Sequence, residues 1–365
     1  MFNHTGSDSV YFNREGRYPG PGAYQSKDSP YYDWYGFSSW PDKYDCWWDF
    51  LTLPCVNECC ESYQQYLCGK DGIVRKWLRL GAAGWRLDVA DELSDLLLEK
   101  IVEASKEEKS DALILGEVWE DASNKIAYGQ RRRYFQGHQL HSVMNYPFRN
   151  AVLGFFTGMR AKDAMEILLT VQENYPPQVL RCLMNHLGTH DTERALTVLG
   201  GEALNGRDRE WQSRQRLSPT QRGIALRRLR GASLMQYTLP GVPCIYYGDE
   251  AGMEGYRDPF NRRCFPWGKE DAALTEWYRS LAKLRQTART ALEDSPLVPV
   301  AAFRRCLCYI REGKTQRLLI ALNSGSAAEQ ITLPAGWEKA TCLLGESPSG
   351  SVLTLPPIGF SALLL

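Results

Sequence analysis

The chain has 365 residues, of which 44% are hydrophobic and 24% charged, a balance typical of globular proteins with two or three domains. Its 43 basic and 43 acidic residues cancel, so the overall charge favours neither nucleic acid nor an anionic membrane as a partner. No apolar run reaches the length of a transmembrane helix, and the first residues lack the pattern of a signal peptide.

The 11 cysteines are an odd number, which argues against a framework made only of disulfides. Those between residues 55 and 68 cluster, but their spacing fits no zinc site. Cys244, Cys306 and Cys308 lie in strand-like runs, where buried free thiols are the common outcome. We therefore expect a reduced, cytoplasmic protein.

Aromatic side chains crowd residues 7–57, where glycine, proline and aspartate interrupt every regular pattern. This composition predicts a long irregular loop rather than a helix, and loops of that length inside a domain are usually functional. Aromatic faces suit the apolar patches of sugar rings, although most of these rings can equally well pack the loop itself.

The segment Gly84–Ala90 reads as a short, mostly apolar strand that follows a helix closed by Gly81. Arg86 and Asp88 stand two residues apart, so strand geometry points both side chains to the same face. Charged groups at the carboxyl end of a buried strand favour an active site on an α/β barrel. The alternatives are a structural ion pair, or Asp88 as the N-cap of a helix over Asp91–Lys100.

The same pattern recurs further along the chain. Ala112–Trp119 is an apolar run that contains Glu117 near its end, and Cys182–Asp191 leads to the carboxylate of Asp191. Three apolar runs that each lead to a carboxylate make a simple structural ion pair the weaker interpretation.

Helix, strand and loop alternate around these runs as they do in βα units. A further strand is predicted over Val143–Pro147, and a last barrel helix near Ala273–Thr287. From Pro296 onward the sequence consists of short strand-like runs separated by glycine and proline turns. This pattern predicts a small antiparallel β-sandwich.

Three segments resemble, nearly letter for letter, the signature regions of the α-amylase family of glycoside hydrolases (family 13). They are G-W-R-L-D-V-A from Gly84, G-E-V-W from Gly116 and T-H-D-T-E-R from Thr189, in the order and spacing of the family. Leu53–Asn57 also resembles the M-P-K-L-N motif of the neopullulanase, cyclomaltodextrinase and maltogenic amylase branch, with Cys55 in place of lysine. The resemblance covers nearly the whole chain.

The resemblance implies an α/β fold with a partial (β/α)8 TIM barrel, made of strands 4–8 and the end of strand 3. It places the end of strand 3 and a protruding loop domain at residues 1–57, the rest of the barrel at 58–295 and a C-terminal antiparallel β-sandwich at 296–365. The first residues, Met1–Gly6, resemble the end of the family signature D-G-V-F-N-H-T-G. We therefore expect an N-terminally truncated member that is insoluble or inactive when expressed alone, because a barrel needs all its strands to close.

The resemblance also assigns roles at the first two carboxylates. Asp88 is expected to be the nucleophile, with Arg86 beside it to keep the carboxylate ionised. Glu117 is expected to be the acid/base, with the apolar bulk of Val118 and Trp119 favouring its protonated form.

Asp191 resembles the third carboxylate of the family, which grips sugar hydroxyls more strongly in the transition state. His4 and His190 are expected to donate hydrogen bonds to the sugar that is cleaved, and Arg194 to be a structural partner near Asp191. The expected substrate-binding residues are therefore His4, Arg86, Trp119 and His190.

The expected function is hydrolysis of α-1,4 bonds, with α-1,6 bonds as an extension, in maltodextrins, cyclodextrins or pullulan. Two carboxyl groups about 5–5.5 Å apart achieve this with retention of configuration by double displacement. The alternatives are an α-glucosidase or glycosyl transferase of the same family, or a truncated fragment that binds sugar without catalysis or misfolds.

No cofactor is implied by these residues. Some family members bind calcium through the asparagine equivalent to Asn3, but the other ligands of a six- to eight-oxygen site cannot be traced here, so no metal is predicted. The expected partner is an α-glucan oligosaccharide, with no nucleic acid and no membrane, and with a homodimer as an option for a full-length form.

Overall fold

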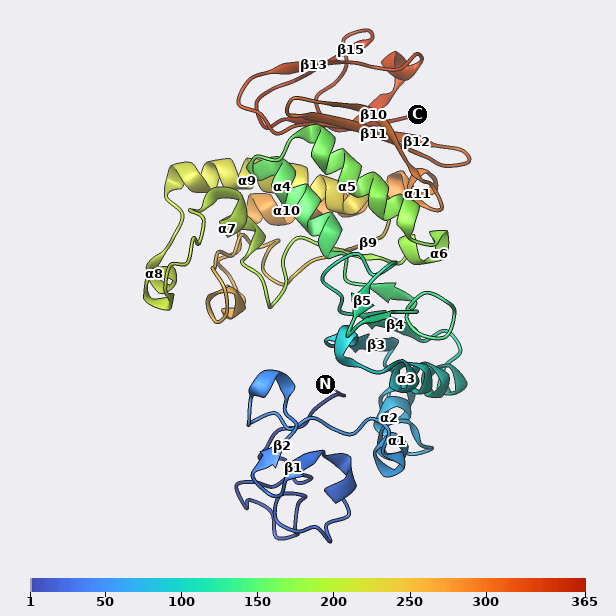
Figure 1. Ribbon diagram of the computed structural model, residues 1–365. Coiled ribbons are helices and arrows are strands. Elements are labelled where there is room, and N and C mark those ends of the chain that lie inside the picture. Colours follow the sequence, from blue (N-terminus) through green and yellow to red (C-terminus); the bar gives the residue numbers. More distant parts are fainter. Residues whose placement is uncertain (1) are drawn as a thin grey trace. The chain divides into compact units, whose positions relative to one another are not determined.

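The computed structural model describes residues 2–365, and its contacts divide the chain into two compact units, Met1–Met144 and Asn145–Leu365 (Figure 1). Met1, where the resemblance to the first signature region begins, lies outside the described residues. The domain boundaries expected after residues 57 and 295 are not those of the two units, and they stay a prediction.

The aromatic-rich segment forms an irregular loop, as its composition predicts. Phe12 is fully buried at its centre and packs against the rings of other aromatic side chains of the same segment, which are Tyr24, Tyr35, Phe37 and Tyr44. Its regular elements are short: η1 (Tyr32–Trp34), β1 (Phe37–Ser39), β2 (Lys43–Tyr44) and η2 (Trp47–Asp49). These buried rings pack the loop itself.

The rest of the first unit has an α/β character. Helices α1 (Glu61–Cys68), α2 (Ile73–Arg79) and α3 (Asp95–Glu108) contact one another, and β5 (Ile126–Ala127) pairs with β6 (Gln130–Arg131). A parallel sheet has the order β3-β4-β7, formed by β3 (Gly84–Leu87), β4 (Leu113–Gly116) and β7 (Ser142–Val143). Gly81 follows α2 with a φ of +105°, as the sequence predicts for a helix end.

Two sequence predictions near these strands are wrong. The helix after β3 begins at Asp95, after the short turn η3 (Ala90–Glu92), and its N-cap is Ser94, which accepts a hydrogen bond from the Leu97 N–H; Asp88 therefore caps nothing. The strand expected over Val143–Pro147 ends at Val143, because Asn145 caps a helix whose first turn holds Pro147.

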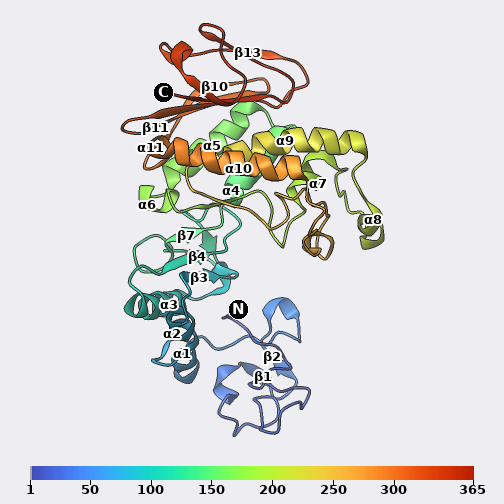
Figure 2. The same ribbon diagram turned by 180° about the vertical axis from the view of Figure 1, so that it is seen from behind.

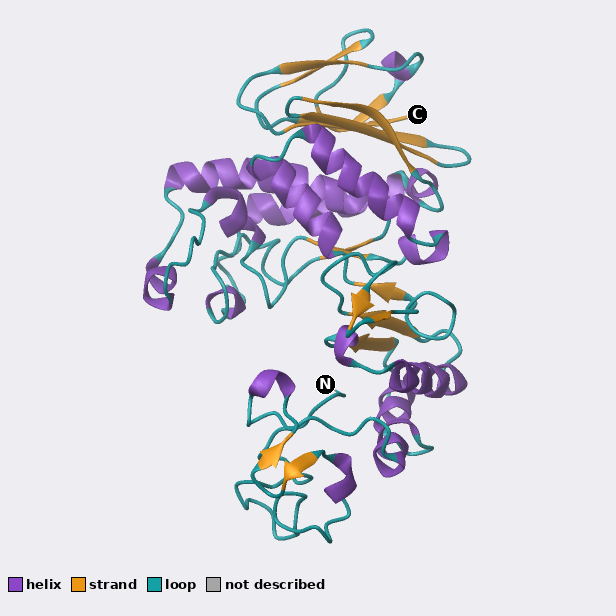
Figure 3. Cartoon of the chain, in the orientation of Figure 1, coloured by secondary structure: helices purple, strands orange, loops and turns teal. Residues whose placement is uncertain are grey.

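Helices dominate the second unit between residues 145 and 295 (Figure 3). They are α4 (Tyr146–Thr157), α5 (Ala161–Asn174), α6 (Pro177–Leu180), α7 (Ala195–Gly200), α8 (Arg209–Arg214), α9 (Pro219–Thr238), α10 (Ala272–Thr287) and α11 (Arg289–Leu292). The strands β8 (Met184–His186) and β9 (Val242–Cys244) pair in parallel, and η4 (Phe260–Arg262) lies in the loop after β9. The bounds of α10 confirm the helix predicted near Ala273–Thr287.

The chain ends in antiparallel β-structure, as predicted. One sheet has the order β10-β11-β12-β16-β14, formed by β10 (Leu297–Phe303), β11 (Cys306–Glu312), β12 (Arg317–Asn323), β14 (Thr341–Gly345) and β16 (Phe360–Leu364). The strands β13 (Glu329–Thr332) and β15 (Val352–Leu355) form a separate pair, and η5 (Trp337–Lys339) lies between β13 and β14.

Strand alternation gives the large C-terminal sheet two apolar faces. Leu318, Ile320 and Leu322 of β12 join a core shared with the helices of the second unit, while Leu319 and Ala321 join a core with β13 and β15. Figure 2 shows the sheet between these two layers.

The described part of the chain supports two further statements. None of its helices combines the length and the apolar composition needed to span a membrane. Cys306 and Cys308 are free cysteines buried in β11, and Cys244 is a free cysteine that is only partly buried.

Candidate active site

Asp88 and Glu117 follow directly after two paired parallel strands. The register sets Leu87 of β3 opposite Gly116 of β4, so the next residue on each strand is a carboxylate. The Glu117 N–H donates to the Leu87 carbonyl at 2.9 Å, and the Ala90 N–H donates to the Glu117 carbonyl at 3.1 Å. Backbone pairing therefore places the two acids side by side at the carboxyl end of this sheet.

A single guanidinium group contacts both carboxylates. Arg86 forms an ion pair with Asp88 through one terminal nitrogen, and with Oε2 of Glu117 at 3.1 Å through the other. Two carboxylates that contact the same guanidinium lie within about 10 Å of each other. This is about the largest separation found in retaining or inverting glycosidases. Arg86 and Asp88 lie on the same face of the strand, as period-two geometry predicts.

Glu117 is surrounded by hydrogen-bond donors. Its side chain is only 7% exposed, and it accepts from the Val89 N–H at 2.9 Å and from the indole N–H of Trp119 at 3.0 Å. The sequence predicts an apolar cover from Trp119, and this is wrong in part. The indole meets the carboxylate through its polar edge, and the Trp119 residue stays 45% exposed.

Val89 has a backbone conformation that its sequence does not predict. Its φ of 45° and ψ of 56° place a β-branched residue in the left-handed region, a strain of about 1–3 kcal/mol that is typical of functional sites. The N–H of the same residue donates to Glu117. The sequence gives no sign of this conformation, because valine disfavours the left-handed region.

His4 is buried beside the same site. Its residue pairs with Cys55 in an isolated β-bridge, and its ring centroid lies 5.4 Å from that of Trp47. Burial lowers the pKa of His4, while the nearby Asp88 carboxylate partly opposes this effect. The imidazole is therefore neutral at physiological pH and can donate a hydrogen bond to a sugar hydroxyl.

Asn3 is the residue at which the resemblance suggests a calcium ligand. Its side-chain oxygen is buried and has no hydrogen-bond partner among residues 2–365. These residues hold no group of three or more His, Cys, Asp or Glu side chains that could bind a metal ion. Calcium also takes carbonyl and amide oxygens, so the expectation that no metal binds stays a prediction.

The third carboxylate lies in the second unit, in the turn after β8. His190 contacts Oδ2 of Asp191 at 3.1 Å, and Arg262 contacts Oδ1 at 3.4 Å. Asp191 also lines an open cavity of about 340 Å³ together with Arg209, Gln212, Arg257, Asp258 and Arg262. Sequence reasoning missed Arg262, which stands 71 positions beyond Asp191 in a loop with no recognised motif.

Arg194 is structural, but its partner differs from the one expected. The side chain is fully buried and donates to Asp249 at 3.2 Å and to the Asn261 carbonyl at 2.8 Å, so its ion pair is with Asp249 rather than Asp191. Burial raises the pKa of Asp249 to about 6, although the Arg194 charge opposes the shift.

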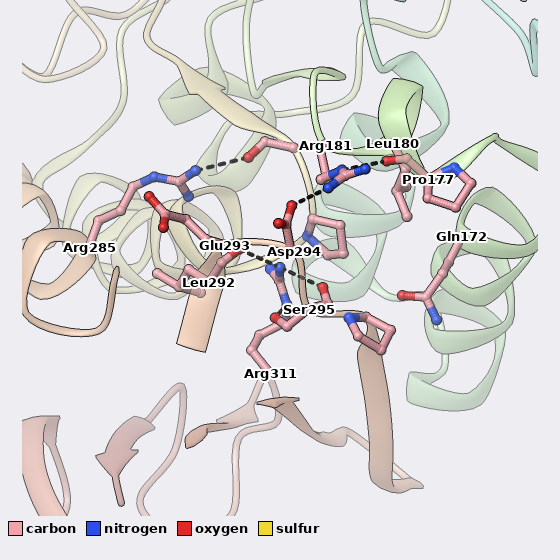
Figure 4. A pocket seen from close by; sticks show the side chains of 13 residues that line it. Gln172, Pro177, Leu180, Arg181, Arg285, Leu292, Glu293, Asp294, Ser295 and Arg311 are labelled. Atoms are coloured by element: carbon pink, nitrogen blue, oxygen red, sulfur yellow. Dashed lines mark hydrogen bonds and ion pairs between the residues drawn. The ribbon is translucent and has the colours of Figure 1, made fainter. Parts of the chain in front are cut away.

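Another cavity of the second unit contains none of these residues. It measures about 520 Å³ and is lined by Arg181, Arg285 and Arg311, among others (Figure 4). The arginines are engaged: Arg181 pairs with Asp294, and Arg285 and Arg311 donate to main-chain carbonyls. These arginines therefore already have hydrogen-bond partners within the chain.

The predicted site residues thus divide between the two units. His4, Arg86, Asp88, Glu117 and Trp119 gather in the first, and His190 and Asp191 lie together in the second. That all of them converge on one cleft stays a prediction.

Comparisons with known proteins agree with the motifs. The family described as "Alpha amylase, catalytic domain" matches residues 1–295. A cyclomaltodextrinase from Thermoanaerobacter pseudethanolicus is 31% identical over 371 residues, covering 98% of this chain and 57% of the relative. An amylopullulanase from Thermoanaerobacter thermohydrosulfuricus is 36% identical over 320 residues, covering 78% of this chain and 20% of the relative. The chain therefore spans about half or less of the length of these curated relatives.

Solved structures show the same likeness. A structure titled "Cyclomaltodextrinase" superposes with a TM-score of 0.80 at 30% identity, over 99% of this chain and 59% of that one. A debranching enzyme from Nostoc punctiforme superposes with a TM-score of 0.81 at 24% identity, over 99% of this chain and 74% of that one, and supports the fold alone. With a family match over residues 1–295, and with Asp88 and Glu117 of its signature segments directly after paired strands, the chain belongs to the α-amylase family of glycoside hydrolases.

Proposed function

We propose that the chain carries a retaining glycoside hydrolase site for α-1,4 glucosidic bonds, and for α-1,6 bonds, in maltodextrins, cyclodextrins or pullulan. One observation carries the proposal: Asp88 and Glu117 follow two paired strands and share the guanidinium of Arg86. Cleavage with retention needs two carboxyl groups about 5–5.5 Å apart, and the shared guanidinium of Arg86 supports a close pair of this kind.

The two carboxylates take different roles in the proposed reaction. Asp88, with its side chain 28% exposed, attacks the anomeric carbon and forms a glycosyl ester. Glu117, which is nearly buried, gives its proton to the leaving oxygen and then removes a proton from the attacking water. Neutral His4 donates a hydrogen bond to the sugar, and Trp119 offers an exposed aromatic face beside the acid.

We propose further that Asp191 and His190 grip hydroxyls of the same sugar. This requires the segments after β3, β4 and β8 to meet at the carboxyl ends of barrel strands, as in a (β/α)8 fold. The names of the relatives, cyclomaltodextrinase and amylopullulanase, support cyclic and branched α-glucans as the substrate class. The two carboxyl groups supply the nucleophile and the proton, so the proposed reaction uses no cofactor.

The test is a pair of substitutions assayed on maltodextrin and on an aryl maltoside with an activated leaving group. Asp88→Asn is expected to lower kcat at least about 1,000-fold on both substrates, because an amide cannot form the glycosyl ester. Glu117→Gln is expected to stop maltodextrin hydrolysis but to spare the activated substrate, which needs no proton on its leaving group.

The matched control is Glu120→Gln, which changes an exposed carboxylate three residues beyond Glu117 and is expected to keep the parent rate. Near-parental turnover of maltodextrin by Asp88→Asn would show that the nucleophile is misassigned.

A further inference from the structure

The turn that carries His190 and Asp191 is held partly by its own hydrogen bonds. The Thr192 N–H donates to the Thr189 carbonyl at 3.3 Å, the Thr189 N–H to the Thr192 hydroxyl at 3.0 Å, and the Asp191 N–H to the Thr189 hydroxyl at 3.2 Å. His190 also contacts the Asp191 carboxylate at 3.1 Å, whereas the main-chain carbonyls of His190 and Thr192 have partners outside the turn.

Asn261 supplies these contacts from η4. Its side-chain amide donates to the carbonyls of His190 and Thr192, both at 2.7 Å, and also lies 3.4 Å from the Thr189 carbonyl. The orientation of the amide follows from this setting, because carbonyl oxygens accept only from its NH2 side. The residue is fully buried.

Asn261 is itself held in place. Its own carbonyl accepts a hydrogen bond from Nε of Arg194 at 2.8 Å, and Arg194 is fixed by the buried carboxylate of Asp249. Buried polar contacts therefore link Asp249, Arg194 and Asn261 to the main chain of the turn.

The neighbouring residue completes the support. Arg262 donates through Nε to the His190 carbonyl at 3.0 Å and contacts the Asp191 carboxylate at 3.4 Å. Successive residues of η4 thus hold the main chain and the carboxylate of the same turn.

We propose that Asn261 is a positioning residue for Asp191. The inference rests on the proposed function, in which Asp191 grips the sugar more strongly in the transition state. Such a grip depends on position, since a displacement of about 1 Å can lower a rate about 100-fold. Asn261 touches no substrate in this scheme and acts only through the turn.

The experiment is a double-mutant cycle on the full chain, with an aryl maltoside as the substrate. Asn261→Ala is expected to lower kcat/KM about 100-fold, mainly through kcat. In an Asp191→Asn background the same substitution is expected to lower it less than about 3-fold, because the group that Asn261 positions is already absent. Equal losses in both backgrounds would overturn the proposal.

Asn323 provides a matched control. It is also fully buried and donates to main-chain carbonyls, those of Ala327 at 2.8 Å and Pro356 at 3.0 Å, but it is the last residue of β12 in the C-terminal sheet. Asn323→Ala is expected to lower stability and to leave kcat of the folded protein unchanged. A similar loss of kcat in both single variants would show a general structural effect and would overturn the proposal.

Hydrogen exchange separates this proposal from the proposed function. In Asn261→Ala, a peptide over residues 188–193 is expected to exchange faster than in the parent, whether or not the parent hydrolyses sugar; Asn323→Ala is expected to leave that peptide unchanged. Unaltered exchange in Asn261→Ala would contradict the proposal. Faster exchange in this variant together with an inactive parent would contradict only the hydrolase assignment. Asn261→Ser, which keeps one hydroxyl donor, replaces the alanine variant if that one does not fold.

Discussion

At two positions of the proposed site, one side chain contacts two separate groups. Arg86 reaches both proposed catalytic carboxylates, and Asn261 reaches two carbonyls at hydrogen-bond distance on one turn. Replacing either by a residue of similar size but fewer donors would leave buried acceptors unpaired, which is more unfavourable than the loss of one exposed contact.

His186 offers a prediction at the same scale. It is fully buried in β8, its Nδ1–H donates to the Met184 carbonyl, and its Nε2 has no protein partner among residues 2–365. Burial lowers its pKa from 6.5 to about 3, with a smaller contribution from the charge of Arg149.

The unfolded chain therefore binds more protons than the folded one below pH 6.5. Stability from neutral His186 is fully present above that pH and is lost as the pH falls toward 3, by up to about 3 kcal/mol between pH 6.5 and pH 4. We expect urea unfolding of His186→Asn to depend less on pH over this window. His138→Asn, at an exposed histidine, is the control, and an equal pH dependence in all three proteins would contradict the assignment.

At the scale of elements, Arg311 of β11 joins a sheet to the ends of two helices. It is 2% exposed and donates to the carbonyls of Thr238 and Leu292, the last residues of α9 and α11. These carbonyls lack partners within their helices and carry partial negative charge, which compensates a buried cation that has no carboxylate partner. Burial lowers the pKa of Arg311 to about 10, so it stays protonated near neutral pH.

Arg311→Met is accordingly expected to lower the free energy of unfolding by about 3–5 kcal/mol, because buried carbonyls are left without a donor. Arg304→Met, which removes an exposed ion pair with Glu329, is expected to change it by less than about 1 kcal/mol. Chemical denaturation of both variants measures the difference. Equal, small effects would show that Arg311 does not cap these helices.

At the scale of the whole molecule, the second unit has a core that crosses from its helices into its C-terminal sheet. One cluster includes Leu229 of α9, Leu281 of α10 and Ile320 of β12, all fully buried. A continuous core implies that helices and sheet lose their structure together rather than as separate domains.

Ile320→Ala tests this coupling. It is expected to lower the free energy of unfolding by about 2–5 kcal/mol, the usual effect of truncating a buried aliphatic side chain. Under native-state hydrogen exchange, α9 and β12 are expected to lose protection by the same amount. Val298→Ala, at an exposed position of β10, serves as the control. Continued protection of α9 while β12 opens would show that residues 296–365 unfold as a separate domain.

The sequence alone determined the family, and it placed Asp88 and Glu117 after neighbouring strands. This was possible because Asp88 and Glu117 each follow a strand end within a local pattern and could be placed from residues a few positions away. The antiparallel C-terminal structure and the helix over Ala272–Thr287 followed for the same reason, from local periodicity and turn residues.

Only the tertiary structure decided the features that depend on distant or strained groups. Asn261 meets a turn about 70 positions earlier in the chain, and Arg194 pairs with Asp249 rather than with its neighbour in sequence. Val89 adopts a conformation that valine resists, because surrounding contacts hold it there. Local propensity carries no information about such contacts, since their free energy comes from groups that meet only when the chain folds.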